Sequence, residues 1–124
     1  MPRIDNANPP RFTIPGVEFT AVAAPSRGTG ETAVWRASVA PGSDGAIHQM
    51  TREEIIVAVA GKGTIRIAGE AHRLVPGDAF AVPPFTDFQV GSTAAAPFEA
   101  IFILPAGARA VVAGQPAFQP PWSV

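Results

Sequence analysis

The chain contains no cysteine and no tyrosine among its 124 residues. The lack of cysteine excludes disulfide bridges, zinc–thiolate sites and thiol nucleophiles. Because tyrosine is missing as well, an acid or base in a reaction would have to be a His, Asp, Glu or Lys side chain, or water. Only two histidines are present, so chemistry by an imidazole has two candidate positions, His48 and His72.

An excess of charge is missing too. Nine Lys and Arg residues against ten Asp and Glu residues give a formal net charge of −1, which creates no field that attracts nucleic acid or an anionic membrane. No apolar stretch approaches the ~18 residues of a membrane span, and the first sixteen residues lack the apolar centre of a signal peptide. We therefore expect a cytoplasmic protein that binds neither nucleic acid nor membranes.

Proline and glycine, by contrast, are plentiful, with fourteen and twelve residues. They interrupt helices but suit short strands joined by tight turns. Apolar residues alternate with others in five segments, which is the strand period: 16–25, 31–42, 63–69, 78–84 and 97–105. We predict one all-β domain over residues 1–124, with an N-terminal arm at 1–12 and a proline-rich tail at 115–124.

The segment around residues 51–67 allows two secondary structures. Thr51 followed by Glu54 ahead of an apolar run matches a helix capping box. The run itself is rich in β-branched residues, stops at Gly61, and is followed after Lys62 by a second alternating run. These features favour two strands joined by a turn. We therefore expect a β-hairpin here.

A motif with fixed spacing begins at Gly42. His48 follows after five intervening residues, then Met50 after one, Glu54 after three and Gly61 after six. This spacing resembles the first motif of the cupin superfamily, G-x5-H-x-H-x3-E-x6-G.

A second stretch resembles the second cupin motif. It contains PGD at 76–78 and VPP at 82–84, and the two motifs together cover residues 42–92. The resemblance implies a single-domain jelly-roll barrel, also called a double-stranded β-helix, whose closure removes exposed strand edges.

The resemblance also implies where a metal would bind. In cupins the ligands are two histidines and a glutamate of the first motif and one histidine of the second. His48 and Glu54 stand at two of these positions, whereas Met50 and Phe88 stand at the others. A thioether is a weak, soft donor and a phenyl ring donates nothing, so the usual N and O ligand set is not assembled. We expect no metal and no other cofactor.

Two alternatives would restore a metal site. If the second motif is shifted by one residue, Asp87 turns inward in place of Phe88, because neighbouring strand positions face opposite sides. His48, Glu54 and Asp87 would then form a facial set of ligands. His72 could also bend in as a ligand. For Asp87, exposure in a turn is more common than a role as metal ligand. For His72, a half-exposed position on a strand is likewise the more common situation.

A barrel of this kind would enclose an imidazole and a carboxyl group in an apolar pocket. Burial moves the pKa values of both groups unless they pair. We predict His48 as general base or acid, with Glu54 orienting it. The predicted wall suits a small hydrophobic or aromatic molecule and consists of Trp35, Met50, Ile56, Phe80, Phe88, Phe98 and Phe102. The sequence does not decide whether Trp35 or its neighbour Arg36 faces this pocket.

These features predict a small-molecule-binding cupin. The first interpretation is a metal-independent enzyme of the isomerase, lyase or cyclase type. The alternatives are a non-catalytic binding or sensing module, and a metal-dependent enzyme that uses His48, Glu54 and Asp87 or His72. Because cupins commonly pair through edge strands or N-terminal segments, we also predict a homodimer with residues 11–22 as a contact.

Overall fold

The computed structural model describes residues 3–124, and their regular secondary structure consists almost wholly of β-strands. The strands are β1 (Arg11–Ile14), β2 (Val17–Ala23), β3 (Thr32–Val39), β4 (Gln49–Met50), β5 (Glu54–Ala60), β6 (Gly63–Ile67), β7 (Glu70–Leu74), β8 (Ala79–Val82), β9 (Phe88–Ser92), β10 (Phe98–Pro105) and β11 (Ala110–Val111). Two single-turn 3₁₀ helices are η1 (Pro25–Arg27) and η2 (Pro121–Ser123). No helix in the described part of the chain is long and apolar enough to cross a membrane.

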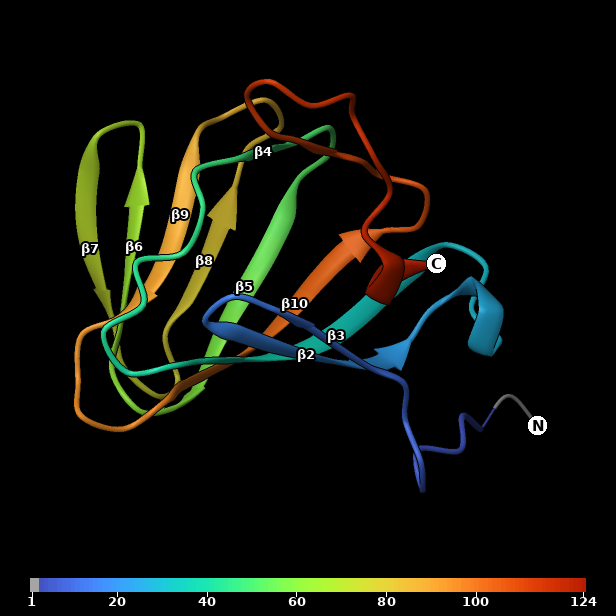
Figure 1. Cartoon of the computed structure of the whole chain (residues 1–124). Helices are drawn as coiled ribbons and strands as arrows, with labels where there is room; N and C mark the ends of the chain where they lie inside the picture. The colour runs from blue at the N-terminus through green and yellow to red at the C-terminus, as the bar shows by residue number, and fades with distance from the viewer. Residues whose placement is uncertain (1–2) are drawn as a thin grey trace.

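The strands form two main sheets and a short ribbon. The larger sheet has the order β1-β2-β3-β10-β5-β8, the smaller one has the order β7-β6-β9, and β4 pairs with β11. Neighbouring strands are antiparallel throughout. Figure 1 shows the small sheet beside the large one, with the C-terminal segment crossing one end of the barrel. The predicted all-β architecture is confirmed.

Alternation along the central strands builds the core. On β10, Phe98, Ala100, Phe102 and Leu104 are buried, and the residues that alternate with them face outward. β3 lies beside it in register, so Trp35 is opposite Phe102 and is 3% exposed. Arg36 therefore points away from the core. Its guanidinium Nε lies 3.3 Å from the Glu99 carboxylate on the outer side.

The expected hairpin between β5 and β6 is wrong. The two strands are separate, as predicted, but β5 pairs with β10 and β8 in the large sheet, whereas β6 pairs with β7 and β9 in the small one. Gly61, with φ +78°, redirects the chain from one sheet to the other, and a Cβ there would lie 2.2 Å from the Pro97 carbonyl oxygen. The true hairpin joins β6 to β7 through Ala68 and Gly69, both at positive φ.

Parts of the predicted arm and of the predicted tail belong to the barrel. Arg11 and Phe12, at the end of the predicted arm, already belong to β1. In the predicted tail, the Trp122 ring stacks on Phe19, with centroids 3.7 Å apart and an interplanar angle of 8°. The Ser26 hydroxyl donates to the Val124 carbonyl. The C-terminal segment is thus a packed cover over one end of the barrel.

Candidate functional site

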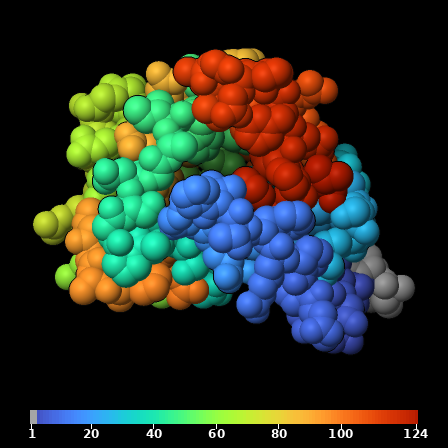
Figure 2. All heavy atoms as spheres, viewed as in Figure 1, coloured from blue at the N-terminus to red at the C-terminus, as the bar shows by residue number. Residues whose placement is uncertain are grey.

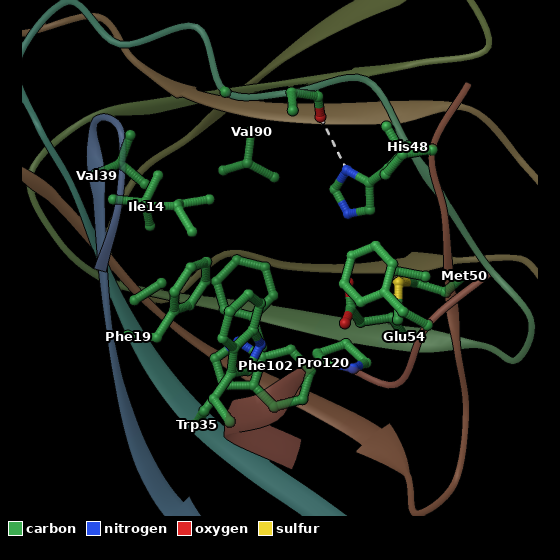
Figure 3. A pocket seen from close by; sticks show the side chains of 18 residues that line it. Ile14, Phe19, Trp35, Val39, His48, Met50, Glu54, Val90, Phe102 and Pro120 are labelled. Atoms are coloured by element: carbon green, nitrogen blue, oxygen red, sulfur yellow. Dashed lines mark hydrogen bonds between the residues drawn. The ribbon is translucent and has the colours of Figure 1, made fainter. Parts of the chain in front are cut away.

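A cavity of about 150 Å³ lies inside the barrel at the end that the C-terminal segment covers. Figure 2 shows its opening as a hollow bordered by the N-terminal strands in blue and the C-terminal segment in red. Its wall is almost entirely apolar, and His48 and Glu54 are the titratable side chains among its described lining residues. Figure 3 shows these two side chains on the same side of the cavity, with the aromatic groups facing them.

His48 directly precedes β4. Its backbone exchanges two hydrogen bonds of 3.0 Å with Phe88 at the start of β9. The segment before it runs close to β9 because Gly45 has φ +71° and lies so near the Val90 carbonyl that a Cβ would approach the oxygen to 2.2 Å. Ala46 follows directly, so the glycine permits the turn that presents the Ala46 carbonyl to the histidine ring.

That carbonyl sets the tautomer of His48. The ring Nδ1 lies 2.8 Å from the Ala46 oxygen, which can only accept, so Nδ1 carries the proton and donates it. Nε2 is then left with a free lone pair, and in Figure 3 it points toward the side of the cavity where Glu54 lies. The Phe88 ring packs against the imidazole, with centroids 4.3 Å apart, and restricts its rotation.

Burial lowers the pKa of His48 below its ordinary value of 6.5, and the hydrogen bond to Ala46 opposes this shift only in part. The imidazole is therefore neutral at pH 7. A neutral ring with a free Nε2 is a proton acceptor.

Glu54 is the first residue of β5 and is 2% exposed. It faces inward because it alternates with Ile55, whose side chain is on the outer face. Burial raises the pKa of its carboxyl group from 4.5 to about 8. At pH 7 the group is thus mainly protonated and can donate a hydrogen bond or a proton.

The predicted orienting role of Glu54 needs a correction. Within residues 3–124 no hydrogen bond joins its carboxyl group to His48, and the Ala46 carbonyl is the group that holds the imidazole. Because the two side chains do not pair, neither one stabilises the charged form of the other. Burial therefore shifts their pKa values in opposite directions, and for His48 the hydrogen bond to Ala46 opposes the shift only in part.

The alternative metal ligands are not brought to the cavity. Phe88 is the inward residue of β9, at 2% exposure. Its neighbour Asp87 faces outward and accepts a 2.9 Å hydrogen bond from Gln49 Nε2, so the one-residue shift of the second motif is wrong. His72 lies on β7 with its Nε2 3.6 Å from Glu70, outside the cavity.

The donors that remain do not fit a cupin metal centre. Met50 is buried at 2% and lines the cavity beside His48 and Glu54, so the available donors are one imidazole, one carboxyl and one thioether. No group of three or more His, Asp or Glu side chains that could hold a metal ion occurs in the described residues. This donor set lacks the three or four N and O ligands that iron, manganese or zinc sites use.

Three of the predicted wall residues lie where the sequence placed them. Trp35, Met50 and Phe102 line the cavity. The rings of Trp35 and Phe102 are parallel, with centroids 5.7 Å apart, and form an aromatic floor from neighbouring strands. That these side chains contact a substrate stays a prediction.

The other four predicted wall residues do not line the cavity. Ile56 and Phe98 are fully buried in the core between the sheets, and Phe88 lies behind the His48 ring. Phe80 is half-buried on β8, with its ring 5.1 Å from His72. An apolar residue on the inward face of a barrel strand more often fills the core than borders a cavity, and these four positions follow that rule.

The C-terminal segment contributes to the wall of the cavity, which the sequence did not lead us to expect. Phe118, Pro120 and Trp122 all line the cavity, although the segment was expected to be a tail. Large apolar residues at every second position from 118 to 122 are a strand-like alternation, and this signal could have assigned them to the interior. Residues of the first hairpin, including Phe19, complete this side of the wall.

Solved structures of known proteins share this fold. The barrel resembles a polyketide cyclase, RemF from Streptomyces resistomycificus, with a TM-score of 0.80 over 94% of this chain and 87% of that one, at 12% identity. It also resembles KdgF from Halomonas sp., with a TM-score of 0.64 over 81% and 90% of the two chains at 26% identity. A salicylate 1,2-dioxygenase from Pseudaminobacter salicylatoxidans gives 0.71 over 86% and 33% at 18% identity. The fold is a cupin jelly roll, as predicted.

The amino-acid sequence assigns the chain to one family of cupins. Residues 3–100 match the family model described as auxin binding protein, and the chain belongs to this family of cupins. Auxin-binding protein 1 of Arabidopsis thaliana is 35% identical over 74 residues. The match covers 59% of this chain but only 37% of the plant protein.

Proposed function

We propose that the protein binds a small, uncharged hydrophobic or aromatic molecule in the cavity and moves a proton within it. It would act as a metal-independent enzyme of the isomerase, lyase or cyclase type. One observation carries this proposal: a proton acceptor, His48, and a proton donor, Glu54, line the same apolar cavity without being bonded to each other.

The size and polarity of the cavity limit the ligand. An engineered protein cavity of about 150 Å³ with an apolar lining holds one benzene molecule, so a volume of about 150 Å³ suits a single aromatic ring with small substituents. No Lys or Arg side chain is among the described lining residues. A charged ligand would therefore lose its hydration without gaining a partner, whereas a neutral one would not.

The two titratable groups provide the chemistry. Nε2 of His48 takes a proton from a C–H or O–H group of the ligand, and the resulting imidazolium keeps its Nδ1 hydrogen bond to Ala46. The Glu54 carboxyl donates its proton to a second atom of the ligand. Protons are removed and added in equal number, so the reaction needs no oxidant or reductant. Opposite pKa shifts are the arrangement expected of an acid and base that work near neutral pH.

A second candidate is a binding protein without turnover. The family description and the name of the plant relative both refer to binding, and the same cavity would serve. In that case His48 and Glu54 would only hydrogen-bond the ligand. The homodimer and the cytoplasmic location stay predictions under either function.

Binding and turnover can be separated by three variants. Neutral single-ring aromatics such as phenol and acetophenone, with benzoate as the charged counterpart, would be screened by thermal shift and by NMR for product formation. Ala37→Leu adds three carbons to the cavity wall and is expected to abolish binding. His48→Gln and Glu54→Gln are expected to retain binding and to lose turnover of any ligand that reacts.

The outcomes distinguish the candidates. Product formation that is unaffected by His48→Gln would refute the catalytic role, and ligands that bind but never react would favour the binding protein. Binding that survives Ala37→Leu, or that prefers benzoate over phenol, would place the site elsewhere. Phe85→Ala, at an exposed position outside the cavity, is the matched control.

A further inference from the structure

Residues 44–47, which we call the 44–47 loop, precede His48 and run along β9, the edge strand of the small sheet. The loop is anchored to β9 at both of its ends. Before it, the Ser43 carbonyl accepts a 2.9 Å hydrogen bond from the Ser92 backbone. After it, His48 exchanges its two backbone hydrogen bonds with Phe88. The loop therefore spans the distance between two fixed points on one strand.

Between these points the loop cannot pair with β9 as a regular ladder. Its four residues lie opposite only three residues of the strand, 89–91, and one extra residue disrupts the hydrogen bonds of a ladder. Within residues 3–124 the loop makes no backbone–backbone hydrogen bond. Burial does not anchor it either, because all four of its residues are exposed, Ile47 by 59%.

The side chain of Gln89 supplies hydrogen bonds that the backbone of β9 does not. Gln89 faces away from the cavity, because its neighbours Phe88 and Val90 are the buried residues of the strand. Its Nε2 donates to the Asp44 carbonyl at 3.0 Å and to the Gly45 carbonyl at 3.4 Å. An amide nitrogen carries two hydrogens, so one side chain can serve both carbonyls. Gln89 thus ties the middle of the loop to β9.

The next carbonyl of the loop is the one that holds the His48 ring. Ala46 follows Gly45 directly, and its oxygen accepts the 2.8 Å hydrogen bond from Nδ1 that is dashed in Figure 3. Within residues 3–124 this is the one hydrogen bond of the imidazole. If the loop moves, nothing else in this part of the chain keeps the proton on Nδ1. The neutral ring then divides between two tautomers, and in the second one Nε2 carries the proton and cannot accept another.

We infer that Gln89 is a positioning residue for His48: its side-chain amide fixes the 44–47 loop, and through the Ala46 carbonyl it keeps Nε2 of the ring free as a proton acceptor. The effect on turnover rests on the function proposed above, whereas the tautomer of His48 exists without a ligand. A side chain outside the cavity thereby controls the base inside it. Catalytic groups need such support, because a side chain carried by an unsupported loop loses its productive geometry.

The test is long-range proton–nitrogen correlation NMR of the full chain, labelled with nitrogen-15 in histidine, at pH 8 and without ligand. The spectrum of His48→Gln assigns the His48 signals, and the wild type is expected to show the Nδ1–H form. Gln89→Met keeps the length of the side chain but removes its donor. It is expected to lower the ratio of the Nδ1–H to the Nε2–H form about tenfold, which corresponds to one lost hydrogen bond.

Gln49→Met is the matched control. The Gln49 amide also makes an exposed hydrogen bond, 2.9 Å to Asp87, and lies next to His48 in the sequence, but it does not contact the loop. This variant is expected to leave the tautomer of His48 unchanged. An equal change in Gln49→Met and Gln89→Met would overturn the inference.

Circular dichroism checks that Gln89→Met folds, and Gln89→Asn, whose amide is one methylene too short to reach the loop, takes its place if it does not. A His48 ring that stays in the Nδ1–H form without the Gln89 amide overturns the inference. For any ligand that reacts, Gln89→Met is expected to lower kcat about tenfold and to change KM less than about twofold. A changed tautomer together with ligands that never react would refute the enzyme and leave Gln89 as the residue that positions His48.

Discussion

At the residue scale, the proposed chemistry depends on two side chains, His48 and Glu54, that line one cavity but share no hydrogen bond. The Ala46 carbonyl holds His48 with its acceptor nitrogen free, and burial keeps Glu54 protonated. If the two groups were bonded, Nε2 would already be occupied and the carboxyl proton already donated. Their separation keeps one acceptor and one donor available to a ligand.

Burial of Glu54 also predicts how stability depends on pH. Folding raises the pKa of this group from 4.5 to about 8, so between these pH values the unfolded chain is ionised while the folded chain is protonated. The folded state then binds more protons. The Glu54 contribution to the free energy of unfolding therefore falls as pH rises from 4.5 to 8, by about 1.4 kcal/mol per pH unit, and is constant outside this window.

Glu54→Gln removes this titration and keeps the shape of the protonated group. The difference in free energy of unfolding between variant and wild type is expected to shift by several kcal/mol in favour of the variant between pH 4 and pH 8.5. Urea unfolding followed by tryptophan fluorescence at pH 4, 6.5 and 8.5 measures it. Contributions from all other groups cancel in the difference, so a difference that does not change with pH would contradict the raised pKa.

At the element scale, the C-terminal segment closes the barrel through side chains and has little regular structure of its own. Phe118 exchanges backbone hydrogen bonds of 2.7 and 3.1 Å with Ala110, and two residues after Pro120 the Trp122 ring stacks on Phe19 of β2. The segment thus ties the first hairpin to β11. Removing the stacked ring should loosen the cover and the cavity together.

We expect Trp122→Ala to lower the free energy of unfolding by about 2 kcal/mol, because a half-buried tryptophan loses its apolar contacts with Phe19 and Phe12. Urea titration followed by far-ultraviolet circular dichroism gives the value. Phe85→Ala at a 62% exposed position should change stability by less than about 0.5 kcal/mol. Equal effects of the two substitutions would show that the C-terminal segment does not contribute to the stability of the barrel.

At the scale of the whole molecule, the sheets are made of strands distant in sequence. β10 pairs with β3 and β5, and β2 and β3 stand at the opposite end of the chain from it. Because these pairings close long loops before they gain contacts, refolding is expected in milliseconds to seconds, as for other all-β domains. Stopped-flow dilution from urea, followed by tryptophan fluorescence, tests this. Refolding in microseconds would indicate that local contacts dominate.

Local patterns in the sequence predicted some features of the fold and the site but not others. Alternation located the strands, and motif spacing located His48 and Glu54, because both are local patterns. Local patterns did not reveal that β5 and β6 belong to different sheets, since a strand and a turn look alike whether the next strand pairs or crosses over. Nor did they show that Ile56 and Phe98 fill the core while Phe118 borders the cavity.

By itself the sequence determined the class of fold, the shared face of each strand and the deficit of metal ligands, since these depend on residue types and on a period of two. Only the tertiary structure decided which face is inside. Trp35 and Arg36 are neighbours on one strand, and nothing local distinguishes their sides until β10 and the C-terminal segment pack on one of them. The same packing turned Phe88 inward and Asp87 outward, and it left the acid and the base of the cavity unpaired.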